Sequence, residues 1–377
     1  MKLPGYLLFI FCIIPGWIPG HAQVSIYSDK VVTCKVDTVL HHIYNLEFEK
    51  ASENIAEIES AIGPHPAVLL LKAQFIYWKY RPLVKDTKPY WEYEALLKKV
   101  IIEAENNFNN PGLEMEKNFY MMSGYSLLTE QYSEDKDYWK VLSTAKNAYS
   151  YLRDGMGHEE ELPDYFFSTG LYNYYRVKYP ELYPFYKPFL WFFIEGNKDT
   201  GIEQLKEASE RSLFLKEQAY IYLFHIYLRY ENNPSAAFPY ARYLAETFPD
   251  NHRFMTLYTE ALIRQNDFST AAPYAKILSG RENKLYSIPG YLFMGMIAEH
   301  NNNPAEARRY YHYSLSMADD NEGEDDHFVG MSYAGLARLK LKENDITAAR
   351  EYYKLAYKTE PYIPVKSEAN AFFEKYD

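Results

Sequence analysis

The chain has 377 residues, of which 47% are hydrophobic and 24% are charged. This composition is ordinary for a folded globular protein and excludes disorder, collagen and a coiled coil for most of the chain. The formal net charge is −11 and no run of Lys or Arg stands out, so the sequence does not favour DNA, RNA or anionic membrane surfaces as partners. Tyrosine is unusually frequent, at 39 residues.

The first 22 residues have the pattern of a cleaved secretory signal peptide. Lys2 supplies the positive start, residues 7–14 form an apolar core, and small residues precede a cleavage site after Ala22. The apolar core is too short to span a bilayer, and Pro15 follows it directly. We therefore expect a mature protein outside the cytoplasm, with the periplasm favoured over the cell surface.

A short motif recurs along the second half of the chain. Each copy begins with Asn or Asp and ends four residues later in Ala, and the copies end at Ala237, Ala271, Ala307 and Ala349. The spacings between them are 34, 36 and 42 residues. Recurrence at about this length indicates a repeat architecture, in which each unit is too small to bury its apolar face alone.

The motif resembles the tetratricopeptide repeat (TPR), a pair of antiparallel helices with small residues where the helices touch. The resemblance is closest over residues 330–363, through Tyr333, Leu336, Ala337, Ala349, Tyr353 and Ala356. It implies a regular array over residues 218–363 and degenerate hairpins with insertions over residues 32–213. A capping helix would follow over residues 364–377.

The fold class implied by this resemblance is all-α, a right-handed α–α superhelix, or solenoid, of about eight TPR-like hairpins. The chain looks like exported bacterial TPR proteins. The glycine-rich segment from Gly170 to Gly201 is also loosely similar to the tetratricopeptide repeat protein 39 family.

In TPR arrays the first helices of successive hairpins line a concave groove in which helices or extended peptides dock. The family's groove positions, carried onto this sequence, mix Tyr with Arg, which are frequent interface anchors. The predicted partner-binding residues are Phe167, Tyr174, Tyr175, Tyr222, Arg229, Tyr230, Arg253, Glu260, Arg264 and Arg338. The alternative use of these tyrosines is to pack one hairpin against the next. The Lys/Asn carboxylate clamp of chaperone-tail-binding TPR domains is absent.

No catalytic or metal-binding motif is present: the sequence lacks GxSxG, CxxC, HExxH and a phosphate-cradling glycine loop. His225, His300 and His312 have no carboxylate or second His at a ligand spacing, and the acidic run at 319–326 does not fit an EF-hand. Removal of the signal peptide would leave Cys34 alone. We predict no enzyme activity, no cofactor and no metal.

The prediction that follows is a non-enzymatic scaffold that holds a protein or peptide of the cell envelope in the Tyr/Arg groove. It would have no nucleic-acid partner and no transmembrane segment after signal cleavage. The alternative is an aromatic-rich glycan-binding protein of an envelope uptake system, which the tyrosine content favours. An insertion at 177–196, rich in aromatic residues, would be either a sticky platform or a helix folded into the superhelix.

Overall fold

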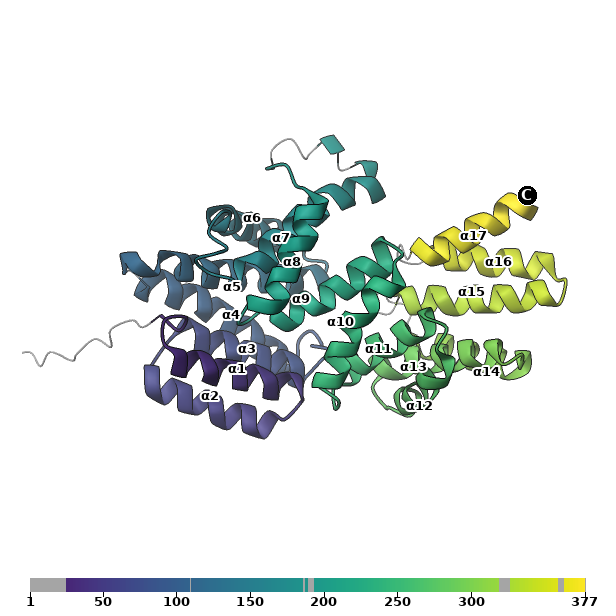
Figure 1. Ribbon diagram of the computed structural model, residues 1–377, viewed down its shortest axis with the longest axis horizontal. Helices are drawn as coiled ribbons and strands as arrows, with labels where there is room; N and C mark the ends of the chain where they lie inside the picture. Colours follow the sequence, from purple (N-terminus) through teal and green to yellow (C-terminus); the bar gives the residue numbers. More distant parts are fainter. Residues whose placement is uncertain are drawn as a thin grey trace, which may run out of the picture.

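The computed structural model describes residues 25–108, 110–185, 187–188, 193–318, 326–358 and 363–376. The predicted signal peptide and residues 319–325 of the acidic run lie outside them. All the secondary structure of the described residues is helical. Most of it forms eight successive helix pairs followed by a single helix (Figure 1). The prediction of an all-α solenoid of about eight TPR-like hairpins is therefore confirmed.

The first four pairs are α1 (Lys30–Tyr44) with α2 (Phe48–Ile62), α3 (Pro66–Lys79) with α4 (Lys88–Asn107), α5 (Glu114–Glu134) with α6 (Tyr138–Gly155), and α7 (Tyr165–Leu182) with α8 (Lys198–Arg211). The next four are α9 (Lys216–His225) with α10 (Pro234–Thr247), α11 (His252–Arg264) with α12 (Phe268–Ser279), α13 (Lys284–His300) with α14 (Pro304–Met317), and α15 (Asp326–Lys342) with α16 (Ile346–Lys358). The last helix, α17 (Ile363–Tyr376), packs against α15 and α16. The short segment η1 (Pro111–Leu113) precedes α5, and the short segment η3 (Ile226–Tyr230) extends α9.

The recurring Asn/Asp motif forms the turn inside each of the last four hairpins. Its first residue caps the second helix by accepting the backbone N–H three residues later, at 3.1–3.2 Å, and these caps are Asn233, Asp267, Asn303 and Asp345. The residue before each cap has a φ between 46° and 61°, and in all four turns it is Asn. Asn tolerates this left-handed conformation better than most residues do. The same turn therefore closes each of these hairpins.

Buried tyrosines use their hydroxyls to join helices. The hydroxyl donates to a carboxylate of a neighbouring element at 2.6–2.8 Å in the pairs Tyr132–Glu94, Tyr174–Glu231, Tyr311–Glu299 and Tyr353–Glu368. A buried phenol needs such a partner, and a charged acceptor makes the bond stronger. These contacts give a packing role to many of the tyrosines that make the composition unusual.

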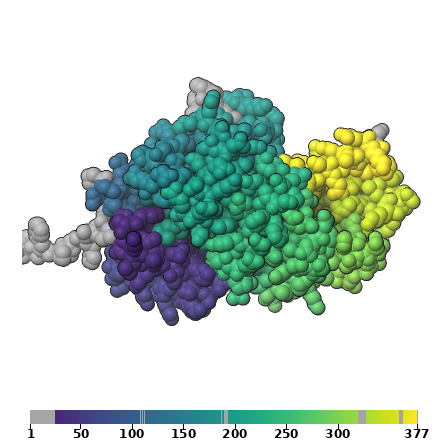
Figure 2. Space-filling view, in the orientation of Figure 1, coloured from purple at the N-terminus to yellow at the C-terminus, as the bar shows by residue number. Residues whose placement is uncertain are grey.

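The first two hairpins lie against the middle of the chain. In Figure 2 the purple N-terminal segment lies directly against the teal and green residues of the central hairpins. The carbonyl of Tyr44, at the end of α1, accepts a hydrogen bond from Asn251 Nδ2 at 2.7 Å. The Tyr44 ring is fully buried and stacks on Phe254 with ring centroids 6.0 Å apart. Farther along, Asn283 Nδ2 donates to the carbonyl of Arg81 at 3.4 Å.

A buried carboxylate also joins the N-terminal segment to the middle of the chain. Asp164, which precedes α7, accepts the hydroxyl of Tyr27 at 2.8 Å and three backbone N–H groups at 2.8–3.0 Å, those of Leu213, Phe214 and Leu215. Burial raises the pKa of Asp164 to about 6 in spite of these bonds. Asp164 thereby joins three parts of the chain: the segment before α1, the fourth hairpin and the segment that leads into α9.

The aromatic insertion, residues 177–196, contains the end of α7 and most of the segment that connects α7 to α8. The end of α7 and the segment after it stand off at the top of Figure 1. Tyr179 and Phe185 are exposed at 47% and 65%, whereas the Phe193 ring contacts Tyr149 with centroids 5.0 Å apart. Several aromatic residues of the insertion lie outside the described part, so both interpretations of the insertion stay open.

Candidate functional site

The helix that begins the fifth hairpin widens at its C-terminal end. Over η3 the backbone N–H of Glu231 bonds to the carbonyl of Ile226, five residues back, at 3.0 Å. This π-type turn is rare and is often found at functional sites. Here it carries Arg229, the central side chain of the site described next.

Arg229 lines a cavity of about 240 Å³. The first helices of the fifth to eighth hairpins contribute to its wall, from α9 with η3, α11, α13 and α15. The loop between α3 and α4 completes it, because the N-terminal hairpins lie against the middle of the chain. Five basic residues line the cavity: Arg81, His225, Arg229, Arg253 and His327.

The charge of this lining is one-sided. None of the described residues that line the cavity is Asp or Glu, although the chain as a whole carries a net charge of −11. The remaining wall is formed by Thr256 and by apolar and aromatic side chains: Leu257, Leu285, Tyr286 and Phe328. Positive charge with low-dielectric walls favours an anion strongly.

The protonation of the two histidines follows from their contacts. Arg229 Nη2 lies 3.0 Å from His327 Nε2. A guanidinium only donates, so Nε2 of His327 is the acceptor and the ring is neutral with its proton on Nδ1. Burial, with the nearby charge of Arg229, lowers the pKa of His225 well below its ordinary value. The fixed positive charge of the cavity at pH 7 therefore belongs to the arginines.

Arg229 Nε and His225 Nδ1, in the wall, are shielded from solvent and have no hydrogen-bond partner among the described residues. Unsatisfied buried polar atoms are rare in folded proteins and carry a free-energy cost. Since Arg229 Nε is a donor, an oxygen acceptor would satisfy it if a small shift of the side chain exposed it to the cavity.

The predicted groove residues fall into separate groups. Arg229 and Arg253 line the cavity. The predicted aromatic residues contact one another: Phe167 and Tyr222 have ring centroids 5.5 Å apart, and Tyr175 and Tyr230 are 5.7 Å apart. Tyr174 is fully buried, and burial, together with its bond to Glu231, raises its pKa far above the ordinary value.

The other predicted groove residues make internal contacts. Glu260 is fully buried. Arg264 donates to Asn232 at 3.2 Å. Arg338 bridges two carboxylates, with Nη2 2.9 Å from Glu299 and Nη1 3.0 Å from Glu368. The structure therefore brings Arg229 and Arg253 together at one cavity, and the partner-binding role of the whole set stays a prediction.

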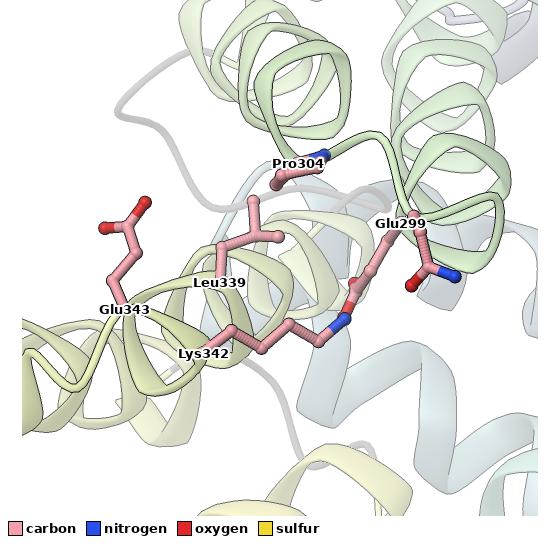
Figure 3. Close-up of a pocket in the computed structure, with 6 residues that line it drawn as sticks. Glu299, Pro304, Leu339, Lys342 and Glu343 are labelled. Atoms are coloured by element: carbon pink, nitrogen blue, oxygen red, sulfur yellow. The ribbon is translucent and has the colours of Figure 1, made fainter.

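A second hollow, of about 260 Å³, lies beside the Arg338 bridge (Figure 3). Lys342 points toward Glu299 in this view, and their charged atoms are 3.7 Å apart. Burial opposes ionisation of Glu299, but its bonds with Arg338 hold the pKa of Glu299 below the ordinary value. The opposite charges at this hollow already pair with each other, so we interpret it as a joint between hairpins.

In the described part of the chain, no group of three or more His, Cys, Asp or Glu side chains is arranged to hold a metal ion. No helix of that part is both long enough and apolar enough to cross a membrane.

The sequence interpretation did not include Arg81, His225 or His327 in the site. A usable signal existed for His225, because it precedes Arg229 by four residues and therefore shares its helix face. Arg81 and His327 reach the cavity only through contacts between segments far apart in the chain, and no local pattern indicates them.

The helix pairs and this lining define an α solenoid of TPR-like hairpins with a basic cavity on the side of its first helices. No family description and no curated protein matches the chain. Solved structures with some similarity include yeast Tom70, with 11% identity over 92% of this chain and 89% of that chain, at a TM-score of 0.37.

Two further structures show similar values. The P58(IPK) TPR domain has 16% identity over 90% of this chain and 98% of that chain, at a TM-score of 0.24. The Cut9–Hcn1 hetero-tetramer of the APC/C has 13% identity over 94% of this chain and 87% of that chain, at a TM-score of 0.31. The fold class rests on the helix pairs themselves, since these TM-scores are low.

Proposed function

We propose that this protein is a non-enzymatic scaffold that holds a protein or peptide partner against the first helices of its fifth to eighth hairpins. The observation that carries the proposal is the basic cavity. Four successive first helices contribute to it, and Arg229 and Arg253 lie in its wall. In repeat arrays the first helices are the surface offered to partners, and Arg is a frequent anchor of such interfaces.

We propose further that the scaffold acts outside the cytoplasm, in the cell envelope. The support for this location is the apolar N-terminal segment that ends at Ala22. Fractionation of cells that express the full chain tests it: a mature protein that begins at Gln23 and is released with the envelope fraction is expected. Retention of the uncleaved chain in the cytoplasmic fraction would contradict this location.

The partner proposal is tested by photo-crosslinking in the native cell. A photo-reactive amino acid at Leu285, which lines the cavity and is partly exposed, samples the proposed site. The same amino acid at Ser316, which is exposed on α14, is the control. We expect a discrete protein adduct from position 285 that is absent from position 316.

Two variants separate the cavity from general charge effects. Arg229→Gln combined with Arg253→Gln should abolish the adduct from position 285. The matched change Arg242→Gln, at an exposed arginine stacked on Phe238, should preserve it. Equal adducts from both positions, or an adduct that survives the double change, would contradict the proposed site.

The glycan-binding alternative gains no support of this kind. It rests on the number of tyrosines, and many of these are engaged in contacts between helices, as in Tyr174–Glu231 and Tyr311–Glu299.

A further inference from the structure

We propose that the cavity binds a phosphate monoester whose organic part is apolar or aromatic. This inference rests on the proposed function and deepens it, because it names the chemical group that a partner presents to Arg229.

The donors come first. Arg229 Nε and His225 Nδ1 are shielded from solvent and have no hydrogen-bond partner among the described residues. Both belong to residues that line the cavity, and they lie one helical turn apart. Both atoms are shielded from solvent, so an oxyanion would accept from Arg229 Nε, or from Nδ1 of His225 in the tautomer that carries the proton there, only after a small shift of the side chains. Arginine suits such a role because its fork of donors matches planar pairs of oxygen atoms.

The arrangement of the arginines favours a phosphate over a carboxylate. Arg81, Arg229 and Arg253 line the cavity from three separate elements, a loop and two helices. A phosphate monoester has three terminal oxygens and a charge of about −1.5 to −2 at pH 7. A carboxylate has two oxygens in one plane and a single charge. Positive charge contributed by several elements therefore favours the more highly charged tetrahedral group.

The rest of the wall indicates what the phosphate is attached to. Leu257 and Leu285 are aliphatic and Tyr286 and Phe328 are aromatic, so one side of the cavity is suited to an apolar group. Inorganic phosphate would leave this side in contact with water. An ester with a ring or an aliphatic chain would use both sides, as small-molecule sites typically do.

The test is calorimetric titration of the full chain, at constant ionic strength, with phenyl phosphate, inorganic phosphate and benzoate. We expect one molecule of phenyl phosphate per chain, with binding at least about tenfold tighter than that of either other anion, because only phenyl phosphate satisfies both sides of the site. Arg229→Gln should weaken binding of phenyl phosphate about tenfold to a hundredfold. The control Arg242→Gln should leave it unchanged.

Circular dichroism of each variant shows whether it is folded. If Arg229→Gln fails to fold, Arg253→Gln makes the same test from a different helix. Benzoate binding as tight as that of phenyl phosphate would overturn the assignment to phosphate. Absent binding, or binding that neither arginine change weakens, would overturn the site. If phenyl phosphate does not bind in this way but the crosslink from Leu285 to a protein partner persists, the scaffold proposal is retained and only the phosphate site is rejected.

The source of the ester is distinguished by a fourth ligand, N-acetyl-phosphotyrosine amide. Tighter binding of this compound than of phenyl phosphate supports a phosphorylated protein as the source. Weaker binding supports a small phosphate ester, since the blocked backbone then adds only a steric cost.

Discussion

The two ends of this solenoid use the same helical hairpin for different purposes. In the N-terminal part, α1 and the loop after α3 lie against later hairpins, and Tyr44 fills the contact with α11. In the C-terminal part, the first helices leave a cavity with basic walls. The N-terminal part thus uses its surface for contacts within the chain, whereas the C-terminal first helices keep a cavity accessible.

This difference shows that the repeat alone does not decide where a binding surface lies. A stack of hairpins presents its first helices along its whole length, but here the N-terminal hairpins also supply Arg81 to the cavity. The closed part therefore helps to build the open part. The predictions below test each side of this comparison, beginning with the largest effect.

The largest effect is expected from Tyr44→Ala, which empties the contact between α1 and the middle of the chain. The ring is fully buried against Phe254 and Trp78. Its removal should lower the free energy of unfolding by about 4 kcal/mol, as measured by urea unfolding. Tyr80→Ala, at a ring that is 44% exposed, is the control and should cost about 0.5 kcal/mol or less. If Tyr44→Ala lowers the free energy of unfolding as little as the control does, the contact between α1 and the middle of the chain contributes little to stability.

A pH-dependent effect is expected at Glu217, at the start of α9. Burial raises its pKa from 4.5 to about 7. The folded chain therefore binds this proton more tightly than the unfolded chain, so the contribution to stability is complete below pH 4.5 and is lost as the pH rises through 7. Glu217→Gln should raise stability by about 1 kcal/mol or less at pH 5 and by about 3 kcal/mol at pH 8.

Unfolding by urea at both pH values measures this effect, with the exposed Glu53→Gln as the control. Asp164, whose pKa is also raised to about 6 by burial, is present in every variant, so its pH dependence cancels in the comparison. An equal gain at pH 5 and pH 8 would show that Glu217 acts through something other than its proton.

A smaller effect is expected in the C-terminal part, where Tyr311 lies between two glycines. A Cβ atom at Gly335 would lie within 2.4 Å of the Tyr311 ring. Gly335→Ala should therefore cost about 1–2 kcal/mol in urea unfolding, although Ala is the better helix former. Gly280→Ala, whose nearest atom would be at 3.6 Å, should be neutral or slightly stabilising. Equal effects at the two positions would rule out close packing of Tyr311 as the cause.

The smallest effect concerns the turn that precedes α14. Asn302 has a φ of 55°. Asn302→Ala should lower the melting temperature, by an amount equivalent to about 1 kcal/mol, whereas Asn302→Gly should change it by only a few tenths of that amount. A loss of the same size with Gly would mean that the side chain of Asn302, and not its backbone conformation, stabilises the turn.

Much of the fold could be predicted from the sequence because the repeat is local. Asn303 and Asp345 cap their helices from within their own motif, and the buried Ala307 and Ala349 mark where the paired helices meet. Each of these features depends on residues a few positions apart, and a period of about 34 residues in the sequence reveals it.

The cavity could be predicted only in part. Of the family's groove positions, Arg229 and Arg253 line the cavity. The groove positions do not indicate Arg81, which arrives through the fold of the N-terminal hairpins, or the π-type turn that carries Arg229. The position of Arg81 depends on contacts between segments far apart in the chain, so a pattern within one repeat contains no trace of it.

The most direct test of the account joins its two proposals in one measurement. The yield of the protein adduct from a photo-reactive residue at Leu285 is followed while phenyl phosphate is added to the full chain and its partner. The account predicts that the adduct declines as the phosphate fills the cavity, while the chain stays folded. An adduct that stays constant when calorimetry shows the cavity filled would contradict the claim that the partner is held there.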